Sequence, residues 1–187
     1  RDFVQTSIMG GAYALLSSNP TSSFAGSFSP DDMFLNKSDD KWFNKPMRWA
    51  QLVLVENDPG SFDPDFWLDY FKQVHADAAC LSAGGIVAYY PTMVPLHHRS
   101  AWLGDSDPFG YLVKGCRDMN MSVIARTDPH ATWEVVEKKH PDWIQVGLNG
   151  EKRRHWSNPH LWVTCALGPY NFEFMNEVHH ETMELYE

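Results

Sequence analysis

The stretch VIARTDPH, residues 123–130, places chemically active side chains directly after an apolar run. Arg126, Asp128 and His130 offer a guanidinium, a carboxylate and an imidazole, which can donate and accept hydrogen bonds with a polar ligand. If the segment is a strand, alternation puts Arg126 and Asp128 on one side of it, and this favours an ion pair between them over contact with a ligand.

Asp128 has a second interpretation, as the start of a helix. The dipeptide Asp-Pro stands before helix-like periodicity at residues 63–64, 107–108 and 128–129. Aspartate caps a helix well, and proline fits its first turn. We therefore expect a helix to begin at each of these sites, with His130 in the first turn of the third. Capping and ligand binding by Asp128 can hold together.

Two further apolar runs end in polar residues. RWAQLVLVE is followed by Asn57 and Asp58, and AACLSAGG leads into a long loop, residues 84–105. Within this loop His97 and His98 are adjacent, so in an extended chain they face opposite ways and at most one of them serves a given site. We select His97 as the candidate.

Aromatic residues are frequent, at 14% of the chain. Tyr89, Tyr90 and Trp156 could present ring faces to a ligand. The alternative is that each ring pins a loop to the core, and the sequence leaves both interpretations open.

The elements that would position these residues alternate along the chain. Strand-like apolar runs cover residues 48–56, 78–85 and 122–127, and helical periodicity follows each of them. Such alternation predicts an α/β fold with a parallel sheet. Neither a G-x-G-x-x-G nor a Walker sequence follows a strand, so nucleotide binding is disfavoured. Asn149-Gly150 predicts a type I′ β-hairpin inserted after the third strand.

Composition excludes some functions. The formal net charge is −9 and no basic stripe is visible, which disfavours nucleic acid as a partner. Three cysteines lie far apart in apolar surroundings, which indicates buried free thiols rather than a disulfide framework.

The N-terminal segment, residues 1–29, is expected to be a leader outside the folded part. Arg1-Asp2-Phe3-Val4 followed by a Gly- and Ala-rich run resembles a twin-arginine export signal that lacks its first arginine. The apolar stretch 8–16 is shorter than the roughly 20 residues that a membrane span needs. We expect a periplasmic or extracellular protein, exported through the twin-arginine pathway, with no membrane association beyond export.

Longer segments resemble a known family. RWAQLVLVENDPGSFDPDFWLDYFKQVHADAACLSAGG, VIARTDPHATWEVVEKKHPDW and KRRHWSNPHLWVTCALGPYNFEFMNEV look like bacterial glycoside-hydrolase-like barrels. The nearest group is the hypothetical glycosyl hydrolase 6 family, related to α-L-fucosidase-type and β-galactosidase-type barrels. The resemblance implies a (β/α)8 TIM barrel of about 250 residues. Residues 30–187 would supply its first three to four β/α units, as an N-terminal fragment.

The resemblance also implies a function, an exported glycoside hydrolase with a retaining two-carboxylate mechanism. Its nucleophile and acid/base are expected beyond Glu187, and no cofactor or metal is expected. Barrel enzymes place their chemistry at the carboxyl ends of the strands, where we expect carbohydrate-binding residues. They are Asn57, Asp58, Tyr89, Tyr90, His97, Arg126, Asp128, His130 and Trp156.

Two alternatives stay open at this point. A carbohydrate-binding barrel without catalytic carboxylates would have the same fold. A metal-dependent barrel hydrolase, of the amidohydrolase or deacetylase type, would need ligands of the H-x-H kind at a strand end, whereas the first strand ends in VEND. Carbohydrate is the expected partner of both the glycoside hydrolase and the carbohydrate-binding barrel. A homo-oligomer formed through downstream domains is a further option.

Overall fold

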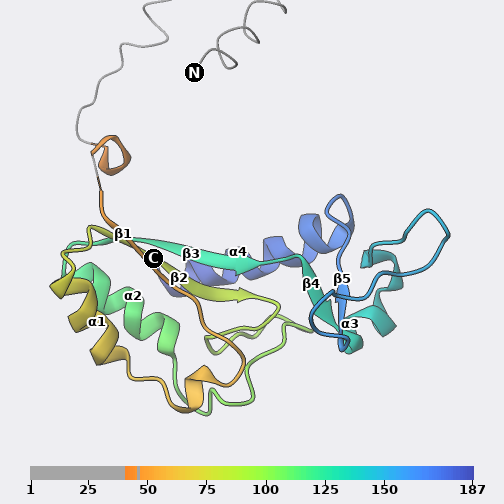
Figure 1. Cartoon of the computed structure of the whole chain (residues 1–187), viewed down its shortest axis with the longest axis horizontal. Helices are drawn as coiled ribbons and strands as arrows, with labels where there is room; N and C mark the ends of the chain where they lie inside the picture. The colour runs from red at the N-terminus through yellow and green to blue at the C-terminus, as the bar shows by residue number, and fades with distance from the viewer. Residues whose placement is uncertain (1–40, 46) are drawn as a thin grey trace, which may run out of the picture. The chain divides into compact units, whose positions relative to one another are not determined.

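The structure is a computed structural model that describes residues 41–45 and 47–187. The predicted leader, residues 1–29, lies outside the described residues. A sheet of three parallel strands has the order β1-β2-β3 (Figure 1), with β1 (Trp49–Leu52), β2 (Ala78–Gly85) and β3 (Ser122–Asp128). Helix α1 (Pro64–Gln73) connects β1 to β2, and α2 (Pro108–Asp118) connects β2 to β3. The predicted α/β fold with a parallel sheet is confirmed.

The first two predicted helix starts are confirmed. The Asp63 carboxylate accepts hydrogen bonds from the backbone N–H groups of Asp65 (3.1 Å) and Phe66 (3.2 Å) at the start of α1. Asp107 accepts from the N–H of Gly110 at 2.8 Å at the start of α2. Both carboxylates satisfy donors that the first helical turn leaves unpaired.

The third predicted helix start is wrong, and Asp128 does not cap a helix. Asp128 still pairs with Gly85 as the last residue of β3, and strand β4 (Ala131–Trp133) follows after two residues. Helix α3 (Glu134–Lys139) begins only after β4. Pairing with neighbouring strands keeps the backbone extended here, and so overrides the local helix signal of Asp-Pro.

A second, antiparallel sheet lies beyond the carboxyl ends of β1–β3 (Figure 1). It pairs β4 with β5 (Leu161–Val163). The chain reverses at Asn149-Gly150, but only Gly150 has a positive φ, of 82°. A type I′ turn requires positive φ at both central residues, so the predicted turn type is wrong. A short 3-10 helix (Pro141–Trp143) precedes this segment, and a π-helical turn (Tyr170–Phe174) leads into α4 (Met175–Leu185).

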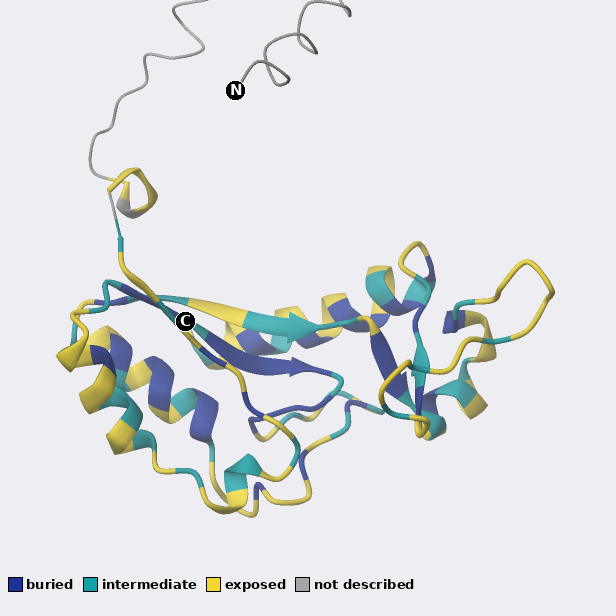
Figure 2. Cartoon of the chain, in the orientation of Figure 1, coloured by how far each residue is buried: buried dark blue, intermediate teal, exposed yellow. Residues whose placement is uncertain are grey.

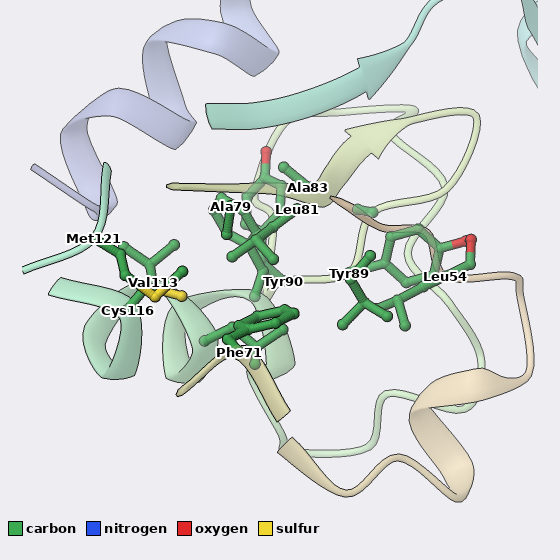
Figure 3. Packing of buried hydrophobic residues seen from close by; sticks show 14 of the residues in the cluster. Leu54, Phe71, Ala79, Leu81, Ala83, Tyr89, Tyr90, Val113, Cys116 and Met121 are labelled. Atoms are coloured by element: carbon green, nitrogen blue, oxygen red, sulfur yellow. The ribbon is translucent and has the colours of Figure 1, made fainter. Parts of the chain in front are cut away.

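The main core lies between the sheet and helices α1 and α2. Strand β2 is central, and seven of its eight residues are buried (Figure 2). Phe71 of α1 and the α2 side chains pack against it, and Figure 3 shows Tyr89 and Tyr90 from the following loop in the same cluster. Buried α2 residues keep the predicted helical spacing; they are Phe109, Leu112, Val113 and Cys116.

The opposite face of the sheet carries apolar side chains that remain exposed. Gln51, Cys80 and Ile124 are in register across the sheet, so they share this face. Ile124 is 42% exposed, and Val53, just after β1, is 47% exposed. Parallel sheets in proteins usually have both faces covered.

The carboxyl end of β2 generates a prediction about stability. Gly85 has φ +103°, and a Cβ there would lie 2.4 Å from the backbone nitrogen of Asp128. Gly85→Ala should therefore cost about 1–2 kcal/mol for the backbone conformation and roughly 1–3 kcal/mol more for the collision. Gly150, with φ +82° and open space around it, is the matched control and should lose the conformational part alone. Urea unfolding of both variants measures the difference, and equal losses would contradict the close approach.

Candidate carbohydrate site at the strand ends

Glu56 and His98 form a polar pair at the carboxyl ends of the first two strands. Glu56 comes shortly after β1, and His98 lies in the loop after β2. The His98 Nε2 lies 3.1 Å from Oε1 and 3.2 Å from Oε2 of Glu56, so its N–H can donate to the carboxylate. The two side chains are 31% and 32% exposed, which leaves both within reach of a ligand.

Neighbouring residues fix the orientation of this pair. The backbone N–H of Ala101 donates to Glu56 Oε1 at 3.2 Å, and the Ser100 hydroxyl donates to the Glu56 carbonyl at 2.6 Å. The His98 ring lies against Trp133 at the end of β4, with ring centres 4.2 Å apart. Trp133 is itself held, because its indole N–H donates to the Ile86 carbonyl at 2.8 Å. The pair is therefore held in place before any ligand binds.

Arg126 and Asp128 form a second polar pair at the end of β3. Arg126 Nη2 lies 2.9 Å from Asp128 Oδ1, which confirms the ion pair expected from strand alternation. The other terminal nitrogen of Arg126, Nη1, is buried and has no hydrogen-bond partner among the described residues. A buried guanidinium nitrogen without a partner is costly, so the accessible polar groups of this pair are the partly exposed remainder of the Arg126 guanidinium and the Asp128 carboxylate.

Tyr89 lies underneath these charges and not at the surface. It is 6% exposed, and its hydroxyl donates to the Leu54 carbonyl at 2.9 Å (Figure 3). Burial raises the pKa of Tyr89, the carboxylates of Glu56, Asp58 and Asp128 raise it further, and Arg126 acts in the opposite direction. The charged groups that shift the pKa of the Tyr89 hydroxyl thus lie near the carboxyl ends of both β1 and β3. Tyr89 therefore forms part of the floor of the site rather than a stacking platform.

Tyr90 and His97 are interior residues, contrary to the expectation that they contact a ligand. Tyr90 is fully buried and donates to Glu181 Oε2 of α4 at 2.8 Å. His97 is 7% exposed, its Nε2 accepts from the Gly85 N–H at 3.2 Å, and its Nδ1 lies 3.1 Å from the Thr92 hydroxyl. Both side chains use their polar atoms to fasten the loop after β2 to β2 and α4.

The two candidates after β1 take different positions. Asp58 Oδ2 accepts the Val55 N–H at 2.7 Å, at the start of a 3-10 turn (Asp58–Gly60). Asn57 precedes that turn, is exposed, and makes no side-chain capping bond there. Asp58 thus has a local structural role, and Asn57 is open to solvent beside Glu56.

His130 and Trp156 meet in the second sheet region. Their rings are nearly parallel, at 22°, with centres 5.6 Å apart, and Trp156 is 74% exposed. His155, which sequence reasoning did not select, packs on Trp156 with ring centres 3.8 Å apart. The structure thus brings two predicted residues together in an exposed aromatic group.

The selected residues did not include Glu56, His98 or Trp133. A signal for Glu56 was its position as the charged residue that ends an apolar strand-like run. His98 carried the same signal as its neighbour His97, and residue type alone could not rank the two. Trp133 could not be recognised as part of the site because a helix, and not strand β4, was expected after Asp128-Pro129.

Among the described residues, no group of three or more His, Cys, Asp or Glu side chains could hold a metal ion. No helix in the described part of the chain is long and apolar enough to cross a membrane. A surface hollow of about 620 Å³ lies between residues 93–95 and α4, and none of the residues of the two polar pairs lines it. The polar side chains, and not the hollows, therefore mark the candidate site.

Comparison with protein families identifies the group to which this fold and these strand ends belong. The profile of the family described as Hypothetical glycosyl hydrolase 6 matches residues 64–187, more than half of the chain. The chain belongs to this family. Among curated proteins, no relative is found.

Two solved structures are similar to this member of the hypothetical glycosyl hydrolase 6 family. α-L-Fucosidase isoenzyme 2 from Paenibacillus thiaminolyticus is 18% identical with a TM-score of 0.55, over 70% of this chain and 20% of that one. A hypothetical protein from Ruminiclostridium thermocellum ATCC 27405 is 16% identical with a TM-score of 0.52, over 73% and 70%. At these identities the likeness concerns the fold. The chain spans about a fifth of the length of the fucosidase.

The buried His97 generates a prediction about pH. Burial lowers its pKa to about 4, from 6.5 for an exposed imidazole. Between pH 4 and 6.5 the unfolded chain binds a proton at His97 and the folded protein does not. The contribution of neutral His97 to the free energy of unfolding is therefore complete above pH 6.5 and is lost as the pH falls toward 4.

Replacing His97 with Gln, whose side-chain oxygen can still accept from Gly85, should flatten the rise of the unfolding free energy over this window. His180→Gln is the matched control, since His180 is an exposed imidazole on α4. Urea unfolding from pH 4 to 7 tests the prediction. Parallel curves for wild type and His97→Gln would contradict it.

Proposed function

We propose that this chain supplies the first β/α units of a (β/α)8 glycoside hydrolase and part of its carbohydrate-binding site. Membership of the hypothetical glycosyl hydrolase 6 family supports a carbohydrate-active enzyme. The parallel sheet, with apolar side chains exposed on the face away from α1 and α2, supports further strands that would close a barrel. Export through the twin-arginine pathway, directed by residues 1–29, is part of the same proposal.

The observation that carries the proposal is the Glu56–His98 pair, whose imidazole ring packs on Trp133. Sugars present hydroxyl groups around a ring whose C–H faces are apolar. A carboxylate and an imidazole beside an indole ring can therefore bind both kinds of surface. The pair lies at the carboxyl ends of the strands, where barrel enzymes place their sites. Arg126 and Asp128 add a donor and an acceptor at the end of the next strand.

The described residues would bind and orient the sugar rather than cleave its bond. Glu56 and Asp128 are each paired with a cation or an imidazole, and we assign neither as the nucleophile. By family resemblance, two catalytic carboxylates would lie on later strands. In a retaining enzyme they would stand about 5–5.5 Å apart.

A non-catalytic carbohydrate-binding barrel is the second candidate. The pairing of Glu56 and Asp128 is compatible with this candidate as well, because both carboxylates would bind sugar in either case. Both candidates require the Glu56–His98 pair to contact sugar. Hydrolysis of any glycoside by the full-length protein would decide between them.

The test of the proposed site uses Glu56→Gln and His98→Ala in the full-length protein. A hydrogen bond to a charged group is worth about 1.5–3 kcal/mol and a neutral one about 0.5–1.5 kcal/mol. Because Gln keeps a neutral acceptor, the affinity of Glu56→Gln for the best-bound oligosaccharide of a neutral panel should fall roughly 5- to 12-fold. Titration calorimetry measures the affinity, and thermal unfolding verifies that the variants fold.

His180→Ala is the control, because His180 and Glu184 form the same kind of pair, 3.4 Å apart, on the exposed surface of α4. It should leave affinity unchanged. Wild-type affinity in folded Glu56→Gln and His98→Ala would refute the site, whereas a full-length protein that binds no carbohydrate would refute the function.

A further inference from the structure

We propose that His130, His155 and Trp156 form a second carbohydrate-stacking subsite, distinct from the Glu56–His98 pair, so that the substrate is an oligosaccharide and not a single sugar. This inference rests on the proposed function and names the substrate class of the same site. It also gives a role to His155, to which neither the sequence pattern nor the strand-end cluster points.

The three rings form one group with an open side. His155 packs on the Trp156 indole, with ring centres 3.8 Å apart and planes at 30°, and His130 lies 5.6 Å from the same indole at 22°. The two imidazoles are 5.5 Å apart. Trp156 nevertheless remains 74% exposed. A broad, exposed indole supported by other rings is a flat apolar surface, which suits the C–H face of a sugar.

His155 holds the indole in place from within the fold. Its Nδ1 lies 3.4 Å from the N–H of Ser157 and 3.3 Å from the N–H of Asn158, and accepts from both. The ring proton is therefore on Nε2, which is buried and has no partner among the described residues. Burial and the nearby His130 both lower the pKa of His155, which favours the uncharged form of the ring under the indole. A platform that is already ordered saves the entropy of immobilising it on binding.

The two aromatic groups lie at opposite ends of β4. His130 precedes the strand, and Trp133, which supports His98, is its last residue. Three steps of extended chain separate the Cα atoms of His130 and Trp133 by about 10 Å. That separation exceeds the width of one sugar ring, so a ligand in contact with both groups has more than one sugar unit.

The experiment compares short and long substrates of the full-length enzyme. A panel of nitrophenyl monosaccharide glycosides identifies the preferred sugar, and a nitrophenyl trisaccharide of that sugar is the long substrate. Trp156→Ala should raise KM for the trisaccharide about tenfold, the effect of about 1.4 kcal/mol, and leave KM for the monosaccharide glycoside unchanged. Trp156→Phe should restore most of the loss.

His155→Ala tests the positioning role. It should raise KM for the trisaccharide without lowering kcat, and reduce the change in tryptophan fluorescence that the trisaccharide produces. Phe66→Ala, which removes an exposed aromatic ring from α1, is the matched control and should leave KM for both substrates unchanged. Equal effects of Trp156→Ala on both substrates, or no effect on either, would overturn the subsite and leave the proposed function intact. Failure of the wild-type enzyme to hydrolyse or bind any member of the panel would overturn the proposed function and the subsite with it.

Discussion

The close approach of chain segments at the carboxyl end of β2 is the constraint on which the site depends. A Cβ on Gly84 would lie 2.8 Å from the ring of His97, and one on Gly85 would collide with the backbone of Asp128. The register between β2 and β3 also shifts between Ser82 and Gly84. Two small residues thus let the end of β3 and the loop after β2 meet at the same point.

Around this meeting point, the side chains of the loop after β2 point in different directions. Tyr89 turns toward the end of β1, where it bonds the Leu54 carbonyl, and Tyr90 turns toward Glu181 of α4. His97 points inward and His98 points toward Glu56. Burial alone would raise the pKa of Glu181, but hydrogen bonds from Thr92, the Met93 N–H and Tyr90 lower it, so its carboxylate remains charged and holds α4 in place. The inward-pointing side chains of this loop, Tyr89, Tyr90 and His97, stabilise the fold, whereas His98 points outward and forms the polar pair with Glu56.

The sequence was sufficient for the elements whose signals are local. Periodicity located α2, and Asp63 and Asp107 cap helices as their positions indicated. Apolar runs located β2 and β3, whereas the first run extends beyond β1, which ends at Leu52. The Leu54 N–H turns instead to the Ser82 hydroxyl, at 3.2 Å.

Features set by tertiary contacts could not be predicted in the same way. Asp128 has the same local sequence as two capping residues, and only its pairing with Gly85 keeps it in a strand. Alternation indicated that His97 and His98 point apart, but which of them faces the site depends on the position of α4. For Tyr89 the sequence left ligand contact and packing of the loop onto the core both open, and the folded-back loop buries its ring.

The central claim is that the carboxyl ends of β1, β2 and β3 contact carbohydrate in a member of the hypothetical glycosyl hydrolase 6 family. The most direct measurement is a crystal structure of the full-length protein soaked with the oligosaccharide that it binds best. We predict sugar hydroxyl groups within hydrogen-bonding distance of the Glu56 carboxylate and His98, with the partly exposed Arg126–Asp128 pair in contact with the same ligand. A well-ordered sugar bound only over the outer helices, or at the amino ends of the strands, would contradict the account.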